Sequence, residues 1–322
     1  MLLAAGGRSL WLAQLPATSV TKASLFAVPG SLARVARLAP RRAALFTGAV
    51  WIAMELFSFA GRVVITNGLW GNASAGTDGR TQSSMIEVER LSKSYGTRAA
   101  VRDVSFVVQP GEVVGLIGLN GAGKTTTLQS IAGIIRPDEG SVRIAGADIA
   151  THPVAAKRQL AFVADEPEFF EYMTVEEHLL LAMKLYATPV RTDADPLTTF
   201  GLHDMRTQFP GELSRGMRQK LAMACVLWRS PKALVFDEPL TGLDPIGIRD
   251  TKDVIRAHAA RGAAVLLSSH LLHLVQELCS RVIILDGGRV VAEHEVAALG
   301  PRVQEPLERL FVEITGTGAI GR

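Results

Sequence analysis

Residues 118–125 combine glycines, a lysine and a threonine at the spacing of a phosphate-binding loop. They read Gly118-Leu119-Asn120-Gly121-Ala122-Gly123-Lys124-Thr125 and satisfy the pattern G-x-x-x-x-G-K-[ST]. Glycines let successive backbone N–H groups turn inward around phosphate oxygens, and a helix beginning at Lys124 directs its positive dipole end to the same anion. The Lys124 ammonium suits the β- and γ-phosphates, and the Thr125 hydroxyl suits Mg²⁺. We expect this loop, together with Thr126, to bind a nucleotide.

A second chemical feature is the acidic pair Asp237 and Glu238, which follows the apolar run 233–236. An acid at the carboxyl end of a buried strand lies where ligands bind in open α/β sheets. Asp237 would then hold Mg²⁺, directly or through water, and Glu238 would polarise the attacking water as a general base. The pair follows Lys124 by more than a hundred residues, which is enough chain for an inserted helical region.

The elements that must position these residues begin near residue 86. Short apolar runs alternate with helical segments, and this pattern predicts an α/β fold with a mostly parallel sheet covered on both faces. The expected strands are residues 86–91, 104–108, 112–117, 161–163, 233–236, 264–267 and 282–285. Cys225 and Cys279 lie in apolar helical patterns, which predicts buried thiols.

Residues 1–84 differ from the rest of the chain in composition and charge. They hold eight Lys or Arg against two acids, whereas residues 85–322 hold 26 basic and 29 acidic residues. The main domain therefore has no global charge that favours nucleic acid. The apolar run 43–61 is long enough to span a bilayer, and three interpretations stay open: a membrane anchor, a targeting segment, or sequence that precedes a true start at Met85. We favour the last, and expect an extension that is poorly ordered and dispensable for nucleotide hydrolysis.

Further motifs occur in the order found in a known family. Tyr95 in SKSYG resembles an aromatic residue that stacks on adenine, and His270 in SSHLL resembles a switch histidine that contacts the γ-phosphate. The run Leu213-Ser214-Arg215-Gly216-Met217-Arg218-Gln219 resembles the signature LSGGMxQ, and Leu240-Thr241-Gly242-Leu243-Asp244-Pro245 resembles a loop at a dimer interface. Over residues 85–310 the sequence resembles the nucleotide-binding domain of ATP-binding cassette (ABC) transporters, in particular the bacterial single-domain exporter-like type.

The resemblance implies an ATPase subunit that uses ATP and Mg²⁺ and partners a separate membrane permease at the cytoplasmic face of the cell membrane. It implies a P-loop domain with a small antiparallel β-subdomain (about 86–115) and a helical lobe (about 166–229), followed by a tail over 311–322. Lys124, Glu238 and His270 would be catalytic. The signature residues Ser214, Arg215, Gly216 and Met217 would close over ATP bound by a second cassette in a head-to-tail dimer, with Leu243 and Asp244 at the interface.

Two positions depart from the family pattern. Arg215 stands where the family usually has the first glycine of its signature. Asp165 aligns with a Gln or Glu that contacts Mg²⁺ and the attacking water, and it is one methylene shorter. Glu166 takes that place if the register slips by one residue.

A non-transport ABC ATPase acting on nucleic acid or the ribosome is disfavoured by the net charge of residues 85–322 and by the presence of one cassette. A nucleotide binder without hydrolysis is disfavoured by the intact catalytic residues. Phe169, Phe170 and Tyr172 precede a capping-box-like helix start and form either a permease-docking surface or packing under the lobe. The histidines other than His270 are expected on the surface.

Overall fold

The computed structural model describes residues 84–186, 195–299 and 306–316. The apolar run 43–61, the rest of the predicted extension up to residue 83, and residues 317–322 of the predicted tail lie outside the described residues. None of the helices in the described ranges is both long and apolar enough to cross a membrane.

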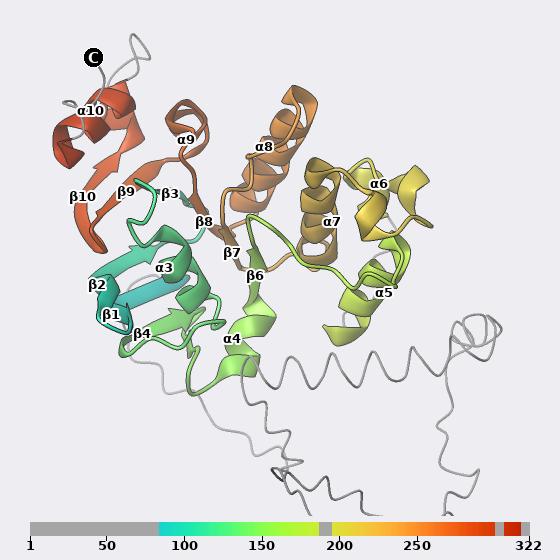
Figure 1. The fold of residues 1–322 in the computed structure, drawn as a ribbon, viewed down its shortest axis with the longest axis horizontal. Coiled ribbons are helices and arrows are strands. Elements are labelled where there is room, and N and C mark those ends of the chain that lie inside the picture. The colour runs from blue at the N-terminus through green and yellow to red at the C-terminus, as the bar shows by residue number, and fades with distance from the viewer. Residues whose placement is uncertain (1–83, 187–194, 300–305, 317–322) are drawn as a thin grey trace, which may run out of the picture. The chain divides into compact units, whose positions relative to one another are not determined.

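A six-stranded sheet forms the centre of the fold, in the order β10-β9-β3-β8-β7-β6 (Figure 1). Its strands are β3 (Val113–Gly118), β6 (Leu160–Val163), β7 (Ala233–Phe236), β8 (Ala264–Ser268), β9 (Arg281–Asp286) and β10 (Arg289–Glu295). All pairs are parallel except the β9–β10 hairpin. The mostly parallel sheet predicted from the sequence is therefore confirmed.

A second sheet is antiparallel, with the order β2-β1-β4-β5. Its strands are β1 (Ile86–Tyr95), β2 (Arg98–Val108), β4 (Glu139–Ile144) and β5 (Ala147–Asp148). The bounds of this antiparallel subdomain differ from the predicted range of about 86–115 at its carboxyl end. It gains residues 139–148, which follow the phosphate-loop helix in the chain, and residues 113–115 belong to β3 of the parallel sheet. The pairing of β1 with β4 joins segments about fifty residues apart, so no short sequence pattern predicts it.

The helices follow the strands in alternation. They are α3 (Lys124–Ile131), α4 (Pro153–Gln159), α5 (Val175–Leu185), α6 (Pro196–Thr199), α7 (Arg215–Leu227), α8 (Pro245–Ala260), α9 (Leu272–Leu278) and α10 (Pro306–Thr315). Three short 3-10 helices are η1 (His203–Met205), η2 (Pro210–Glu212) and η3 (Val296–Leu299). Helices α5, α6 and α7 lie together beyond the edge strand β6 and form the predicted helical lobe (Figure 1).

Both faces of the parallel sheet are buried, and β8 shows why its sequence is continuously apolar. Ala264 and Leu266 pack toward the antiparallel sheet and α3. Val265 and Leu267 point the other way, into a core shared with α7, α8 and α9. A strand buried on both faces has no solvent side to mark with polar residues.

The helix starts of the lobe are built from local side-chain caps. Thr174 and Glu177 form a reciprocal capping box at the start of α5, and the Ser214 hydroxyl accepts the Met217 N–H at the start of α7. Both caps satisfy N–H groups that have no partner within their own helix. The capping-box helix start that the sequence predicts after Tyr172 is confirmed.

Some side chains are more deeply buried than the pattern indicated. His178 and His258 were expected on the surface, yet each is 6 % exposed. Cys225 and Cys279 are buried free thiols, as predicted, and burial raises the pKa of Cys225 to about 12.

At the carboxyl end, α10 spans the predicted boundary between residues 310 and 311, and its Leu307 is fully buried.

Candidate nucleotide-binding site

The glycine-rich loop joins the end of β3 to the start of α3 and requires glycine at two tight points. Gly123 has a φ of 103°, and a Cβ atom there would lie 2.5 Å from the Ala100 carbonyl oxygen. A Cβ atom at Gly118 would lie 2.5 Å from the Leu285 carbonyl oxygen. Only a residue without a side chain fits both places, because the atoms in the way are backbone.

Lys124 lies inside this loop. Its side chain is largely buried, and Nζ donates to the carbonyl oxygens of Gly118 (2.8 Å) and Leu119 (3.2 Å). Burial lowers the pKa of Lys124, while the nearby carboxylates of Glu238 and Asp237 act in the opposite direction. A phosphate oxygen carries negative charge and attracts the ammonium more strongly than a neutral carbonyl oxygen does. The ammonium can therefore exchange these carbonyls for phosphate oxygens.

The acidic pair stands at the same edge of the sheet. Asp237 directly follows β7 and is 3 % exposed. Ser268 ends the neighbouring parallel strand β8, and its hydroxyl donates to Asp237 Oδ1 at 2.6 Å. The same hydroxyl accepts the backbone N–H of Glu238 at 2.9 Å. The Ser268 side chain, at the carboxyl end of β8, therefore holds both acids that follow β7.

Glu238 is held in an uncommon backbone conformation. Its φ is 50°, in the left-handed region, which costs a residue with a side chain about 1–3 kcal/mol. Its Oε2 lies 2.9 Å from His270 Nδ1 and accepts the Thr241 hydroxyl at 3.2 Å. These hydrogen bonds therefore fix the Glu238 carboxylate beside His270.

These groups line one cavity of about 550 Å³. Its lining residues come from segments far apart in the chain: Tyr95, Arg98, Ala100, Asn120, Gly121, Gly123, Lys124, Thr125, Thr126, Asp165, Asp237, Glu238, Thr241 and His270. Tyr95 is about half exposed, and Lys93 Nζ lies over its ring at 5.8 Å from the centroid. The sequence patterns did not predict Arg98, Ala100 and Thr241 as cavity residues, or Ser268 as the residue that holds Asp237 and Glu238. The position of Ser268 at the end of a predicted strand was the available signal.

The signature residues do not line this cavity, and neither do Leu243 and Asp244 of the interface loop. They instead lie against each other: a Cβ atom at Gly216 would lie 3.2 Å from the Gly242 carbonyl oxygen and 3.3 Å from Leu243 Cδ2. Asp244 Oδ1 accepts the Gly247 N–H at 2.8 Å and caps α8. The N-terminus of α7, capped by Ser214, therefore lies against the interface loop and outside the lining of this cavity.

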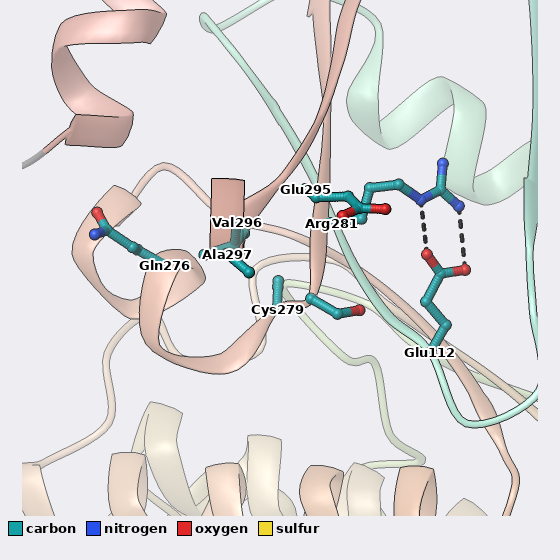
Figure 2. Close-up of a pocket in the computed structure, with 8 residues that line it drawn as sticks. Glu112, Gln276, Cys279, Arg281, Glu295, Val296 and Ala297 are labelled. Atoms are coloured by element: carbon teal, nitrogen blue, oxygen red, sulfur yellow. Dashed lines mark hydrogen bonds and ion pairs between the residues drawn. The ribbon is translucent and has the colours of Figure 1, made fainter. Parts of the chain in front are cut away.

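A second cavity of about 550 Å³ lies beside α9 and η3 (Figure 2). One side carries Arg281, which pairs with both carboxylate oxygens of Glu112. Glu112 precedes β3 and Arg281 begins β9, so this cavity is at the opposite edge of the sheet from the phosphate loop. Ligands of such sheets bind at the carboxyl ends of the strands.

A phosphate loop between β3 and α3, with a buried aspartate directly after β7 of the same parallel sheet, defines the class of P-loop nucleotide hydrolases. The "ABC transporter" family matches residues 101–241. The ABC-type transporter ATP-binding protein EcsA of Bacillus subtilis is 32 % identical over 239 residues, which are 72 % of this chain and 97 % of that protein. The chain belongs to the family of ABC transporter ATP-binding proteins, and it is an ABC-type ATPase.

Other relatives agree. The lipopolysaccharide export system ATP-binding protein LptB of Haemophilus influenzae is 36 % identical over 65 % of this chain and 90 % of its own length. A solved structure described as the ATP binding subunit of an ABC transporter is 37 % identical, with a TM-score of 0.67 over 72 % of this chain and all of that one. The P-loop fold predicted from the sequence is therefore confirmed, and ATP is the nucleotide of the family.

Proposed function

We propose that this chain is the ATP-hydrolysing subunit of an ABC transporter, which works as a head-to-tail dimer and drives a substrate through a separate permease. One observation carries the proposal. The cavity gathers Lys124, Glu238 and His270, yet it lacks the signature residues of the same chain. A nucleotide in this cavity would be enclosed only when a second cassette supplies its signature.

Magnesium fits the donor set of this cavity. The Thr125 hydroxyl and the buried Asp237 carboxylate are hard oxygen donors in the same lining. Within the described residues, no three His, Cys, Asp or Glu side chains gather as a protein-only metal site. Mg²⁺ is commonly held by one or two protein groups together with phosphates and waters. We therefore assign Thr125 and Asp237 as its holders, with Asp165 at the rim, and the bound ion would neutralise charge on the β- and γ-phosphates.

Each catalytic residue then has a separate task. Lys124 supplies a positive charge inside the loop, and the Glu238 carboxylate accepts a proton from the attacking water. His270 lies against Glu238 Oε2 and orients that carboxylate toward the cavity. Tyr95, at the other end of the lining, provides a surface for the adenine ring.

The signature helix supports an action in trans. The first turn of α7 contains no acidic residue, and its N-terminus is an anion-attracting helix end. Because Ser214, Gly216 and Met217 do not line the cavity of their own chain, we infer that this helix end binds the γ-phosphate side of ATP held by the partner. Hydrolysis would remove those contacts and weaken the dimer.

The names of the relatives favour export of the substrate over import. Their printed names include lipopolysaccharide export and Nod factor export ATP-binding proteins. The lobe carries an aromatic surface in front of α5, where Tyr172 is 90 % exposed and Phe170 is partly exposed, while Phe169 packs into the lobe core. We propose that this surface meets a permease at the cytoplasmic face of the membrane. The permease would select the substrate.

The Glu238→Gln variant tests this function. It keeps the shape of the side chain but removes the base, so ATP should still bind while hydrolysis slows by about 10²–10⁴. The variant should accumulate as a dimer with ATP in size-exclusion chromatography. Glu139→Gln, an exposed carboxylate outside the cavity, is the matched control and should behave like the wild type. A Glu238→Gln chain that stays monomeric with ATP while the wild type dimerises would count against the dimer mechanism.

A further inference from the structure

The two residues that depart from the family pattern contact each other. Arg215 is the first residue of α7, and Asp165 lies in the loop after β6, fifty residues earlier. The Arg215 guanidinium donates to Asp165 Oδ1 at 2.7 Å. The usual glycine at position 215 has no side chain with which to make this contact, so the pair requires the departure at position 215.

Arg215 also touches a third segment. A Cβ atom at Gly242 would lie 3.2 Å from Arg215 Cδ and 3.5 Å from Nε. The stem of Arg215 therefore runs along the interface loop on its way to Asp165. One side chain joins the signature helix, the interface loop and the loop that carries Asp165.

Helix α7 holds the Asp165 loop at a second point. The buried Gln219 side chain donates through Nε2 to the Ala164 carbonyl oxygen at 3.2 Å. Gln219 and Arg215 are four residues apart, so they lie on one face of the helix. Asp165 lines the nucleotide cavity, whereas Arg215 does not. The backbone of this loop and the carboxylate at the cavity rim are thus both set by α7.

We propose that Arg215 is a positioning residue that orients the Asp165 carboxylate at the rim of the ATP cavity of its own chain. Asp165 is one methylene shorter than the usual Gln or Glu. The ion pair compensates for this shorter side chain, because Arg215 fixes the direction in which the Asp165 carboxylate points. It also links the signature helix to the cavity rim within one chain, in addition to the action in trans on which the proposed function rests. The competing interpretation is that Arg215 serves the ATP of the partner directly.

The expected size of the effect is modest. Both side chains are about two-fifths exposed, at 42 % and 40 %. Ion pairs at such sites change an equilibrium constant by about 1.5- to 5-fold. The effect should be largest at low salt and should disappear in 1 M NaCl, where the screening length is about 3 Å.

A double-mutant cycle on the full-length chain tests the pair. The variants are Arg215→Gln, Asp165→Asn and the double variant, first measured without nucleotide by urea unfolding at low and at high salt. We expect a coupling of about 1.5- to 5-fold at low salt that is lost in 1 M NaCl. Because this arm uses no ATP, it reports on the pair even if the dimer mechanism fails. Additive effects on unfolding at low salt would overturn the ion pair.

The catalytic arm of the cycle separates the two interpretations. If Arg215 acts through Asp165, Arg215→Gln should lower kcat/KM for ATP about 1.5- to 5-fold in the wild type and change nothing in the Asp165→Asn background. Arg215→Lys should retain part of the effect. An equal loss in both backgrounds would overturn the proposal and assign Arg215 to the partner's ATP. Lys252→Gln with Glu277→Gln is the control pair, with a 2.7 Å contact outside the cavity, and should leave kcat/KM unchanged.

Discussion

The Ser268 hydroxyl donates a 2.6 Å hydrogen bond to the Asp237 carboxylate and accepts the backbone N–H of the next residue, Glu238. Ser268 is fully buried at the end of β8. One hydroxyl therefore orients the proposed magnesium ligand through its side chain and the proposed general base through its backbone. The left-handed conformation of Glu238 depends on partners of this kind.

Replacing Ser268 with alanine is expected to disturb both acids at once. The change leaves a buried carboxylate oxygen and a backbone N–H without this partner, which costs about 1–3 kcal/mol for each unsatisfied group. We expect a lower urea midpoint and a larger loss in kcat than in ATP affinity. Ser269→Ala is the matched control, because its equally buried hydroxyl accepts the Leu271 N–H instead. Equal kcat values for the two variants would show that Ser268 has no special role.

Replacing Lys124 with alanine removes the cation inside the phosphate loop. Charged hydrogen bonds contribute about 1.5–3 kcal/mol, so the Kd for ATP should rise at least about tenfold. Isothermal titration calorimetry measures this directly. Lys157→Ala is a suitable control, because Lys157 is also partly buried and bonds to a backbone carbonyl, that of Gly133, outside the cavity. Unchanged ATP affinity in Lys124→Ala would refute the loop assignment.

His258 should make stability fall in acid. Burial, with a smaller contribution from Arg261, lowers the pKa of His258 to about 4, whereas an unfolded histidine titrates near 6.5. The unfolded chain therefore binds this proton first, and stability is lost as the pH falls from about 6.5 to about 4. The loss approaches about 3 kcal/mol below that range, at roughly 1.4 kcal/mol per pKa unit.

Urea unfolding of the wild type and of His258→Gln between pH 8 and 4 measures this loss. The variant lacks the titrating ring, so its stability should fall less steeply over the same pH window. The difference between the two curves isolates His258 from the other titrating groups. Parallel curves would show that His258 binds its proton equally well in the folded and the unfolded chain, and would contradict the lowered pKa.

The sequence by itself determined the local parts of this protein. The phosphate loop is legible because each of its requirements, a glycine where no Cβ fits and a lysine at the start of α3, is met within eight neighbouring residues. The buried strands can be predicted because a strand covered on both faces is apolar along its whole length. The caps at Thr174 and Ser214 are legible because a side chain and its N–H partner lie three residues apart.

Only the tertiary structure decided which distant residues meet. The pairing of β1 with β4, the burial of His258, and the contacts of Ser268 and Arg215 all join segments that no short pattern connects. Arg215 was visible in the sequence as a departure, and so was Asp165, but their contact depends on how the lobe packs beside β6. The absence of the signature from the cavity of its own chain is likewise a property of packing. Local backbone preferences and periodicity act over a few residues, whereas these contacts are set by the burial of whole elements against one another.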